Sequence, residues 1–174
     1  MYCIELKDES DTLKLGQLLG ESLKQAAAPL SVVFLKGDLG MGKTTLCRGL
    51  LGAFDYNGAV KSPTYTLVEE YALVGHTLYH FDIYRLGDPE ELEYMGIRDF
   101  LCAGEAPVTC IIEWPEKGRG VLPSPDLEIV FGLSGEVRQV ELHMRQSLQQ
   151  SWSDSFLAAC KGAFKSAEHV SGQL

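Results

Sequence analysis

The sequence has 174 residues, of which 45% are hydrophobic and 22% are charged, and its formal net charge is −9 at pH 7. This is ordinary soluble globular composition, and the length is sufficient to bury a sizeable core in one domain. The excess of acidic residues argues against direct binding to a nucleic-acid backbone. We expect one domain over residues 1–165 and a frayed tail over residues 166–174.

The five cysteines are odd in number and widely spaced, and none forms a C-x2-C or another zinc-ligand spacing. They are expected to be reduced thiols in a cytosolic protein. The N-terminus carries acids early and lacks an apolar signal segment, and no run approaches the ~18 apolar residues of a membrane span. These features predict a cytoplasmic protein with no membrane partner.

The predicted elements begin with a short alternating strand over residues 2–6. Acidic and hydroxyl residues after it offer N-caps for a helix over residues 8–25, where leucines recur at helical spacing. A β-branched and aromatic run over residues 32–36 then indicates a buried strand, which ends abruptly in glycines. A second helix is expected over residues 43–53.

Two further strands, over residues 65–71 and 77–84, flank a turn and predict a β-hairpin. A helix in two pieces, broken at Gly96, is expected to continue to about Cys102. The apolar run over residues 108–112 is typical of a parallel strand buried on both faces. The remaining elements are predicted from spacing: strands over 126–131 and 136–143, and a terminal helix over 147–163.

The glycine-rich segment after the 32–36 strand carries the strongest functional signal. Gly37, four residues, and then Gly42-Lys43-Thr44 match the phosphate-binding P-loop pattern G-x4-G-K-[ST]. Glycines let successive N–H groups point at phosphate oxygens, and the following helix adds its free N-terminal donors. Lys43 can reach the β- and γ-phosphates of a nucleotide, and the Thr44 hydroxyl can bind Mg²⁺. The predicted nucleotide-binding residues are Gly37, Asp38, Leu39, Gly40, Met41, Gly42, Lys43, Thr44 and Thr45.

Two acidic residues end apolar strands and are candidates for the chemistry of this site. Asp82 closes the second hairpin strand, and Glu113 closes the 108–112 strand. Ligands of open α/β sheets bind beyond the carboxyl ends of the strands, so either acid can reach Mg²⁺ or orient a water. We favour Glu113 with Thr44 in the Mg²⁺ shell and Asp82 as the residue that orients water or couples the nucleotide to the hairpin.

Three further residues are weighed as part of the site. Thr64, after Ser62-Pro63, is a candidate switch element that senses the γ-phosphate, although a proline-initiated strand start explains it equally well. Trp114 packs in most such positions, but its indole can lie beside the nucleotide. His80 is favoured as a hydrogen-bonded structural residue rather than a base.

Two features of particular classes of P-loop protein are not found in this sequence. The single asparagine, Asn57, is followed by glycine, so the N-K-x-D element of guanine-specific GTPases is absent and GTP specificity is not expected. The arginines considered as lid residues (Arg85, Arg98 and Arg119) are isolated from one another, so the arginine-bearing lid of small kinases is not evident.

Four motifs in order resemble the bacterial TsaE family, also called YjeE, over about residues 2–145. They are the P-loop, Ser62-Pro63-Thr64-Tyr65-Thr66-Leu67-Val68-Glu69, His80-Phe81-Asp82-Ile83-Tyr84-Arg85-Leu86 and Ile112-Glu113-Trp114-Pro115. The resemblance implies an α/β P-loop NTPase fold, with a parallel core sheet extended by antiparallel strands and flanked by helices. It implies hydrolysis of ATP with Mg²⁺ for threonylcarbamoyladenosine modification of tRNA, in a complex with the TsaB–TsaD pair, and contact with tRNA only through that complex.

The resemblance also implies site roles. It places Lys43 and Thr44 at phosphate and Mg²⁺, Thr64 at a switch, Asp82 and Glu113 as the essential acids, and Trp114 near the nucleotide. Met41 departs from the small residue frequent in the family, which raises the question of altered affinity. Alternatives left open are a small-molecule kinase, a nucleotide-binding module without turnover, and a P-loop-like turn with only a structural role.

Overall fold

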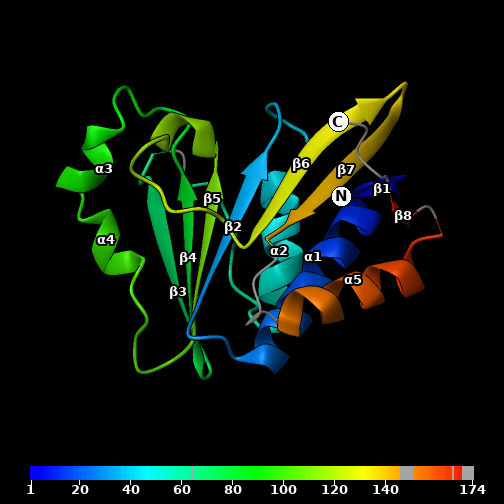
Figure 1. Cartoon of the computed structure of the whole chain (residues 1–174), viewed down its shortest axis with the longest axis horizontal. Helices are drawn as coiled ribbons and strands as arrows, with labels where there is room; N and C mark the ends of the chain where they lie inside the picture. Colours follow the sequence, from blue (N-terminus) through cyan, green and yellow to red (C-terminus); the bar gives the residue numbers. More distant parts are fainter. Residues whose placement is uncertain (64, 146–150, 166, 170–174) are drawn as a thin grey trace.

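The structure is a computed structural model that describes residues 1–63, 65–145, 151–165 and 167–169 (Figure 1). Strands and helices alternate along most of the chain, as expected for an α/β fold. The elements are, in order, β1 (Tyr2–Leu6), α1 (Glu9–Ala26), β2 (Leu30–Lys36), α2 (Lys43–Ala53), β3 (Val68–Leu73), β4 (His76–Asp82), α3 (Glu90–Tyr94), α4 (Ile97–Phe100), β5 (Val108–Glu113), η1 (Pro115–Gly118), β6 (Leu127–Ser134), β7 (Val137–Met144), α5 (Ser151–Ala163) and β8 (Glu168–His169).

The strands form one sheet in the order β3-β4-β5-β2-β6-β7-β1-β8. Its centre is parallel, because β4 pairs with β5, β5 with β2, and β2 with β6 in the parallel sense. The outer pairings, β3 with β4 and β6 with β7, β7 with β1, and β1 with β8, are antiparallel. The predicted parallel core with antiparallel extensions is therefore confirmed.

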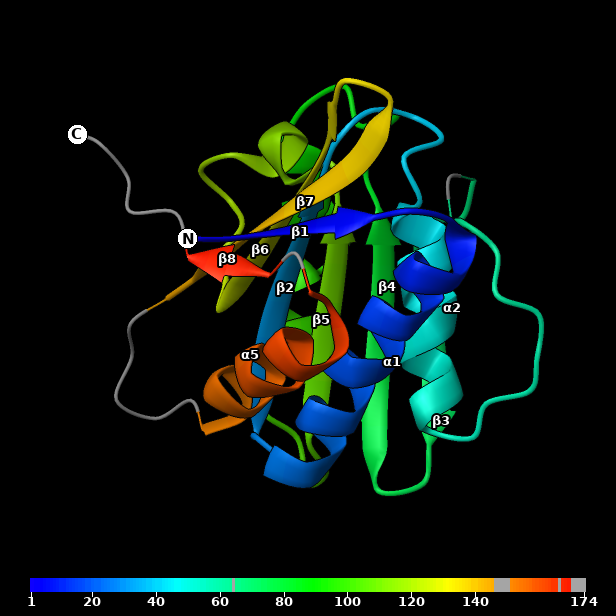
Figure 2. The ribbon, with the colours of Figure 1, turned by 90° about the vertical axis from the view of Figure 1, so that its right-hand side faces the viewer.

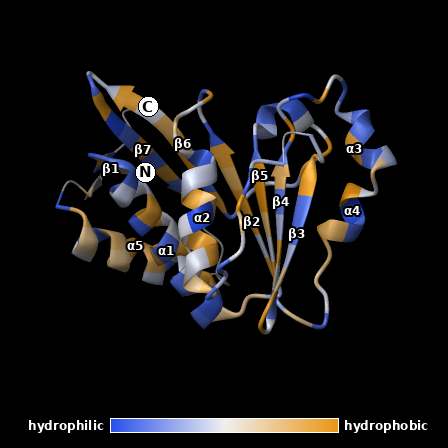
Figure 3. Ribbon diagram, turned by 180° about the vertical axis from the view of Figure 1, so that it is seen from behind, coloured by the Kyte–Doolittle hydropathy of each residue, from blue (hydrophilic) through white to orange (hydrophobic). Residues whose placement is uncertain are grey.

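Helices cover the two faces of this sheet unequally. Figure 2 shows α1, α2 and α5 together in front of the sheet, and Figure 1 shows α3 and α4 at the opposite side of the molecule. Side chains of β2 alternate between these two layers: Val33 and Leu35 pack with the α1, α2 and α5 layer, whereas Val32 and Phe34 pack with the α3 and α4 layer. Hydrophobic colouring accordingly runs along β2 and β5 in Figure 3.

Close packing of α1 on α2 fixes the position of the helix that follows the P-loop. An added Cβ at Gly16 would lie 2.1 Å from the Leu46 carbonyl oxygen, and one at Gly49 would lie 2.1 Å from the Leu13 carbonyl oxygen. Only glycine allows the two backbones to approach this closely, because any side chain would force them apart. The start of α1 is capped as predicted, since the Asp8 carboxylate accepts from the Asp11 N–H at 3.0 Å.

The hairpin prediction is confirmed with corrected bounds. β3 begins at Val68 rather than at Tyr65, because the chain is still turning there: Leu67 has φ = 65° and donates its N–H to the Pro63 carbonyl at 2.7 Å. β4 ends at Asp82, two residues earlier than expected. β4 is both a hairpin arm and a member of the parallel core, a double role that the hairpin pattern in the sequence does not predict.

The described part of the C-terminal region contains a helix and a short strand. The terminal helix α5 begins at Ser151, and the predicted residues before 151 fall within 146–150, outside the described residues. In the predicted tail, Glu168–His169 form β8 and pair with β1. The boundary at residue 165 stays a prediction. Among the described helices, none is long and apolar enough to cross a membrane, and all five cysteines are free thiols.

Candidate nucleotide site

The P-loop connects the carboxyl end of β2 to the first turn of α2. Gly37, Gly40 and Gly42 have φ of 129°, 78° and 107°, and Gly42 is the N-cap of α2. These left-handed conformations are open to glycine and strained for other residues, which explains the spacing of the motif. The loop therefore curls in front of the free N–H groups of α2, the arrangement that binds phosphate oxygens.

Lys43 is folded back into the loop. Its Nζ donates to the Gly37 carbonyl at 2.6 Å and to the Asp38 carbonyl at 2.9 Å. The side chain is buried, and this desolvation lowers the pKa of Lys43 despite the opposing pull of Glu113 and Asp82. The Lys43 ammonium is therefore held inside the loop by two uncharged backbone carbonyls.

The other predicted loop residues surround this lysine. Asp38 and Leu39 are exposed, and Met41 is half-buried against the core layer under α1 and α2. The Met41 side chain therefore packs away from the open side of the loop. Thr44 and Thr45 are half-buried in the first turn of α2, where the Thr44 hydroxyl lies 3.4 Å from Glu113 Oε1.

Asp82 and Glu113 occupy paired positions at the ends of β4 and β5. They are 4% and 3% exposed, so both carboxylates depend on specific donors. Asp82 accepts from the Ser62 hydroxyl at 2.5 Å and from the Tyr84 N–H at 3.1 Å. Glu113 lies 2.9 Å from His80 Nε2. The predicted acids are brought together, each held by different partners.

Two buried side chains continue inward from Glu113: His80 contacts the carboxylate, and Cys47 contacts His80. His80 Nε2 lies 3.5 Å from Cys47 Sγ, and both side chains are inaccessible to solvent. Burial opposes charge on the ring, but the Cys47 sulfur and the Glu113 carboxylate outweigh it and raise the pKa of His80. Burial raises the pKa of the Cys47 thiol. His80 is hydrogen-bonded within the fold, as the sequence analysis favoured.

Trp114 follows β5 with φ = 62° and turns its indole toward the loop. The Lys43 Nζ lies 4.4 Å from the centre of the Trp114 ring. The centre of the Tyr84 ring lies 4.9 Å from the centre of the same Trp114 ring, in a tilted contact. A cavity of about 310 Å³ opens here, lined by Leu39, Gly40, Gly42, Lys43, Thr44, Thr45, Ser62, Asp82, Glu113 and Trp114. Thr64, the predicted switch residue, lies outside the described residues.

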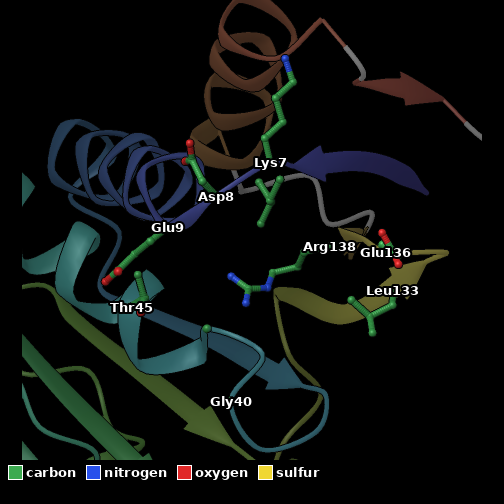
Figure 4. A pocket seen from close by; sticks show the side chains of 10 residues that line it. Lys7, Asp8, Glu9, Gly40, Thr45, Leu133, Glu136 and Arg138 are labelled. Carbon is green, nitrogen blue, oxygen red and sulfur yellow. The ribbon is translucent and has the colours of Figure 1, made fainter.

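A second cavity, of about 390 Å³, lies against another side of the same loop (Figure 4). It shares Gly40, Gly42 and Thr45 with the first cavity, and its other walls are the connection from the end of β1 to the start of α1 and the β6–β7 hairpin. Arg138 extends into it from β7 in Figure 4. Its Nε is buried and has no hydrogen-bond partner among the described residues.

Sequence reasoning missed three residues of this region: Ser62, Cys47 and Arg138. Ser62 belongs to the Ser-Pro-Thr motif, and that motif is the sequence signal for its place beside Asp82. Cys47 and Arg138 carry no local signal, since helix α2 and strand β7 place them by packing with segments far away in the sequence.

A parallel sheet whose central strand leads through a G-x4-G-K-T loop into a helix, with acids at the ends of the adjacent strands, defines a P-loop NTPase fold. Comparison with known proteins agrees with this class. The profile of the family described as "Threonylcarbamoyl adenosine biosynthesis protein TsaE" matches residues 6–140. The chain therefore belongs to the TsaE family.

Individual relatives support this membership. The TsaE protein of Haemophilus influenzae is 45% identical over 152 residues, which cover 87% of this chain and 94% of the relative. The one of Nostoc sp. is 42% identical over 144 residues, or 82% and 85% of the two chains. The crystal structure of Bacillus subtilis YdiB superposes with a TM-score of 0.66 at 25% identity, covering 90% of this chain and 94% of that one.

Proposed function

We propose that this protein is an ATPase of tRNA threonylcarbamoyladenosine biosynthesis that binds and hydrolyses MgATP and is activated by protein partners. The observation that carries the proposal is the pairing of Asp82 and Glu113 at the end of two parallel strands, beside the P-loop lysine. Family membership supports the pathway, since the matching relatives are described as tRNA threonylcarbamoyladenosine biosynthesis proteins. The partner we propose is the TsaB–TsaD pair, with tRNA held through that complex.

The loop geometry fits a bound triphosphate. The curled glycines and the first turn of α2 present backbone donors, and Lys43 exchanges its two carbonyl acceptors for phosphate oxygens. An ammonium–phosphate bond is charge-assisted and stronger than the ammonium–carbonyl bonds that it replaces, so the exchange favours binding.

The two cavities on either side of the loop suggest how the nucleotide lies. The acids and Trp114 line one cavity, which suits the γ-phosphate end, where hydrolysis takes place. The Arg138 cavity then holds the nucleoside end, and the Arg138 guanidinium that lines it offers N–H donors to ribose, base or α-phosphate. This assignment gives Arg138 a binding role, which the sequence analysis did not.

Thr44 and Glu113 fit a magnesium ion. Their oxygens lie 3.4 Å apart at the mouth of the cavity, and hydroxyl and carboxylate oxygens are the ligands that Mg²⁺ prefers. MgATP, when bound, supplies the transferred phosphoryl group and a charge that offsets its oxygens. We assign Asp82 to orienting the attacking water, because the Ser62 hydroxyl and the Tyr84 N–H hold its carboxylate in one orientation.

Weak hydrolysis by the isolated chain is expected because no arginine is among the described residues that line the cavity of the acids. Arg85 stacks on the Tyr65 ring at 4.4 Å, Arg98 pairs with Glu93, and Arg48 pairs with Glu9. None of these three lines the cavity of the acids. A cation supplied by a partner at the γ-phosphate is worth roughly 10³–10⁵ in rate, so we expect partners to provide it.

The test is ATP turnover measured with the protein alone and after addition of the TsaB–TsaD pair. We expect slow turnover alone and a large increase in the mixture, which Lys43→Ala abolishes. A rate that partners leave unchanged, but that rises with a small hydroxyl-bearing acceptor, would support a kinase instead. Nucleotide affinity without turnover in any mixture would leave only a binding module.

A further inference from the structure

Three potential metal ligands meet beneath the P-loop, and each comes from a different element. Cys47 Sγ on α2, His80 Nε2 on β4 and Glu113 Oε1 on β5 all lie within 4.8 Å of one another. All three side chains are buried, with Cys47 and His80 inaccessible to solvent. We propose that this Cys47–His80–Glu113 triad is a binding site for a transition-metal ion of the zinc class, distinct in chemistry from the magnesium of MgATP.

The donor set selects the class of metal. A thiolate and an imidazole are ligands for zinc, cobalt and similar ions, whereas magnesium requires oxygen ligands throughout. On binding, the Cys47 thiol releases its proton, and the His80 proton leaves Nε2, so that three lone pairs face the ion. One sulfur, one nitrogen and one oxygen ligand leave a fourth position for water, as in open zinc sites.

The spacing of the three atoms is close to that of a tetrahedral site. Zinc bonds of about 2.3 Å to sulfur and about 2.0–2.1 Å to nitrogen and oxygen place a sulfur and a nitrogen about 3.6 Å apart and a nitrogen and an oxygen about 3.4 Å apart. The Sγ–Nε2 distance is 3.5 Å, and the Nε2–Oε1 distance is 2.9 Å. The Nε2–Oε1 edge must widen by roughly half an ångström, and the third edge, from Sγ to Oε1, is no longer than 4.8 Å.

Access and affinity also follow from the surroundings. Glu113 lines the 310 Å³ cavity, whereas Cys47 and His80 do not, so an ion would have to enter the triad past the Glu113 carboxylate. Histidine ligands of metals almost always donate their second ring nitrogen, but His80 Nδ1 is buried without a hydrogen-bond partner in the described part of the chain. We therefore expect reversible binding, weaker than that of structural zinc sites.

The triad shares Glu113 with the proposed magnesium site, which makes it inhibitory. An ion bound to Cys47, His80 and Glu113 withdraws that carboxylate from MgATP, so metal and nucleotide should antagonise each other. This consequence rests on the proposed function. The metal site itself does not, because it depends only on the distances and donor chemistry of the three residues.

The experiment is an anaerobic titration of the reduced full chain with Co²⁺. Binding is monitored by the thiolate-to-cobalt absorption and by the visible bands of the bound cobalt ion. We expect one tetrahedral cobalt per chain, displaced by Zn²⁺. Cys47→Ser and His80→Gln should each weaken binding at least about tenfold and remove or alter these bands. Cys110→Ser is the matched control, since Cys110 is equally buried but bonds to the Phe100 carbonyl, and it should leave the spectrum unchanged.

Circular dichroism and thermal unfolding of each metal-free variant show whether that variant is still folded. A folded variant that binds cobalt weakly has lost a metal ligand and not its structure. An absent spectrum in the folded wild-type chain, or one that persists in folded Cys47→Ser, would overturn the site. MgADP added to the cobalt form should displace the metal. A spectrum unaffected while MgADP binds would contradict the shared use of Glu113, whereas failure of MgADP to bind would count against the proposed function alone.

Discussion

Asp82 and Glu113 face each other directly across two neighbouring parallel strands, in register and at the same edge of the sheet. Parallel strands bring their carboxyl ends to one edge, so a pairing of last residues places both carboxylates at the mouth of the P-loop. Their hydrogen-bond partners differ, since Ser62 holds Asp82 while His80 holds Glu113. Strand position therefore does not distinguish the two acids, but their hydrogen-bond partners do.

The two acids give the first prediction. Glu113→Gln should weaken Mg²⁺-dependent ATP binding, because the carboxylate lies beside the Thr44 hydroxyl. Asp82→Asn should leave binding largely intact and lower turnover in the activated complex. ATP affinity with and without Mg²⁺, measured by calorimetry in both variants, decides between the roles. The opposite pattern would exchange them, and no effect in either variant would remove both acids from the site.

Lys43→Ala should reduce ATP affinity roughly 10- to 100-fold, since the charge-assisted bonds of one ammonium are worth about 1.5–3 kcal/mol. Lys24→Ala is the control, because Lys24 pairs with Asp55 and caps the Ala53 carbonyl at the far end of α2. Equal ATP affinity in wild type and Lys43→Ala would contradict nucleotide binding at this loop.

Arg138→Met should weaken ATP binding while sparing inorganic triphosphate. Methionine keeps much of the apolar stem and removes the guanidinium donors that line the 390 Å³ cavity. Lys43→Ala is the contrasting variant, because it should weaken both ligands. If Arg138→Met lost affinity for ATP and triphosphate equally, Arg138 would bind phosphate and the nucleoside assignment would be wrong.

Gly49→Ala should destabilise the fold by about 1–3 kcal/mol or more, because the new methyl group would meet the Leu13 carbonyl where α1 crosses α2. Gly52→Ala on the same helix is the matched control. Its Cβ would meet open space, and alanine should stabilise the helix by up to about 1 kcal/mol. Urea unfolding of both variants measures the difference, and equal stabilities would show that the helix contact tolerates a side chain.

His76 should make stability fall in mild acid. Burial lowers the pKa of His76, which lies 2.9 Å from the Thr109 hydroxyl, so the unfolded chain binds a proton more readily than the folded one. Its contribution is present above about pH 6.5 and is lost as the pH falls below that value toward the folded pKa. His76→Gln keeps a hydrogen-bonding group and should lessen this decline, as measured by urea unfolding between about pH 5 and about pH 7. An identical decline in the variant would assign it to other groups.

The sequence by itself determined the P-loop, the buried strand over residues 108–112, and the two acids that close their strands. These signals are local: glycine is needed where the backbone turns left-handed, and an apolar run is needed where a strand is covered on both faces. Only the tertiary structure decided that β4 joins the parallel core, that His80 and Cys47 lie beneath Glu113, and that Arg138 reaches the loop from β7. The register between strands distant in sequence is set by the packing of whole layers, so no spacing along the chain reveals which side chains will meet.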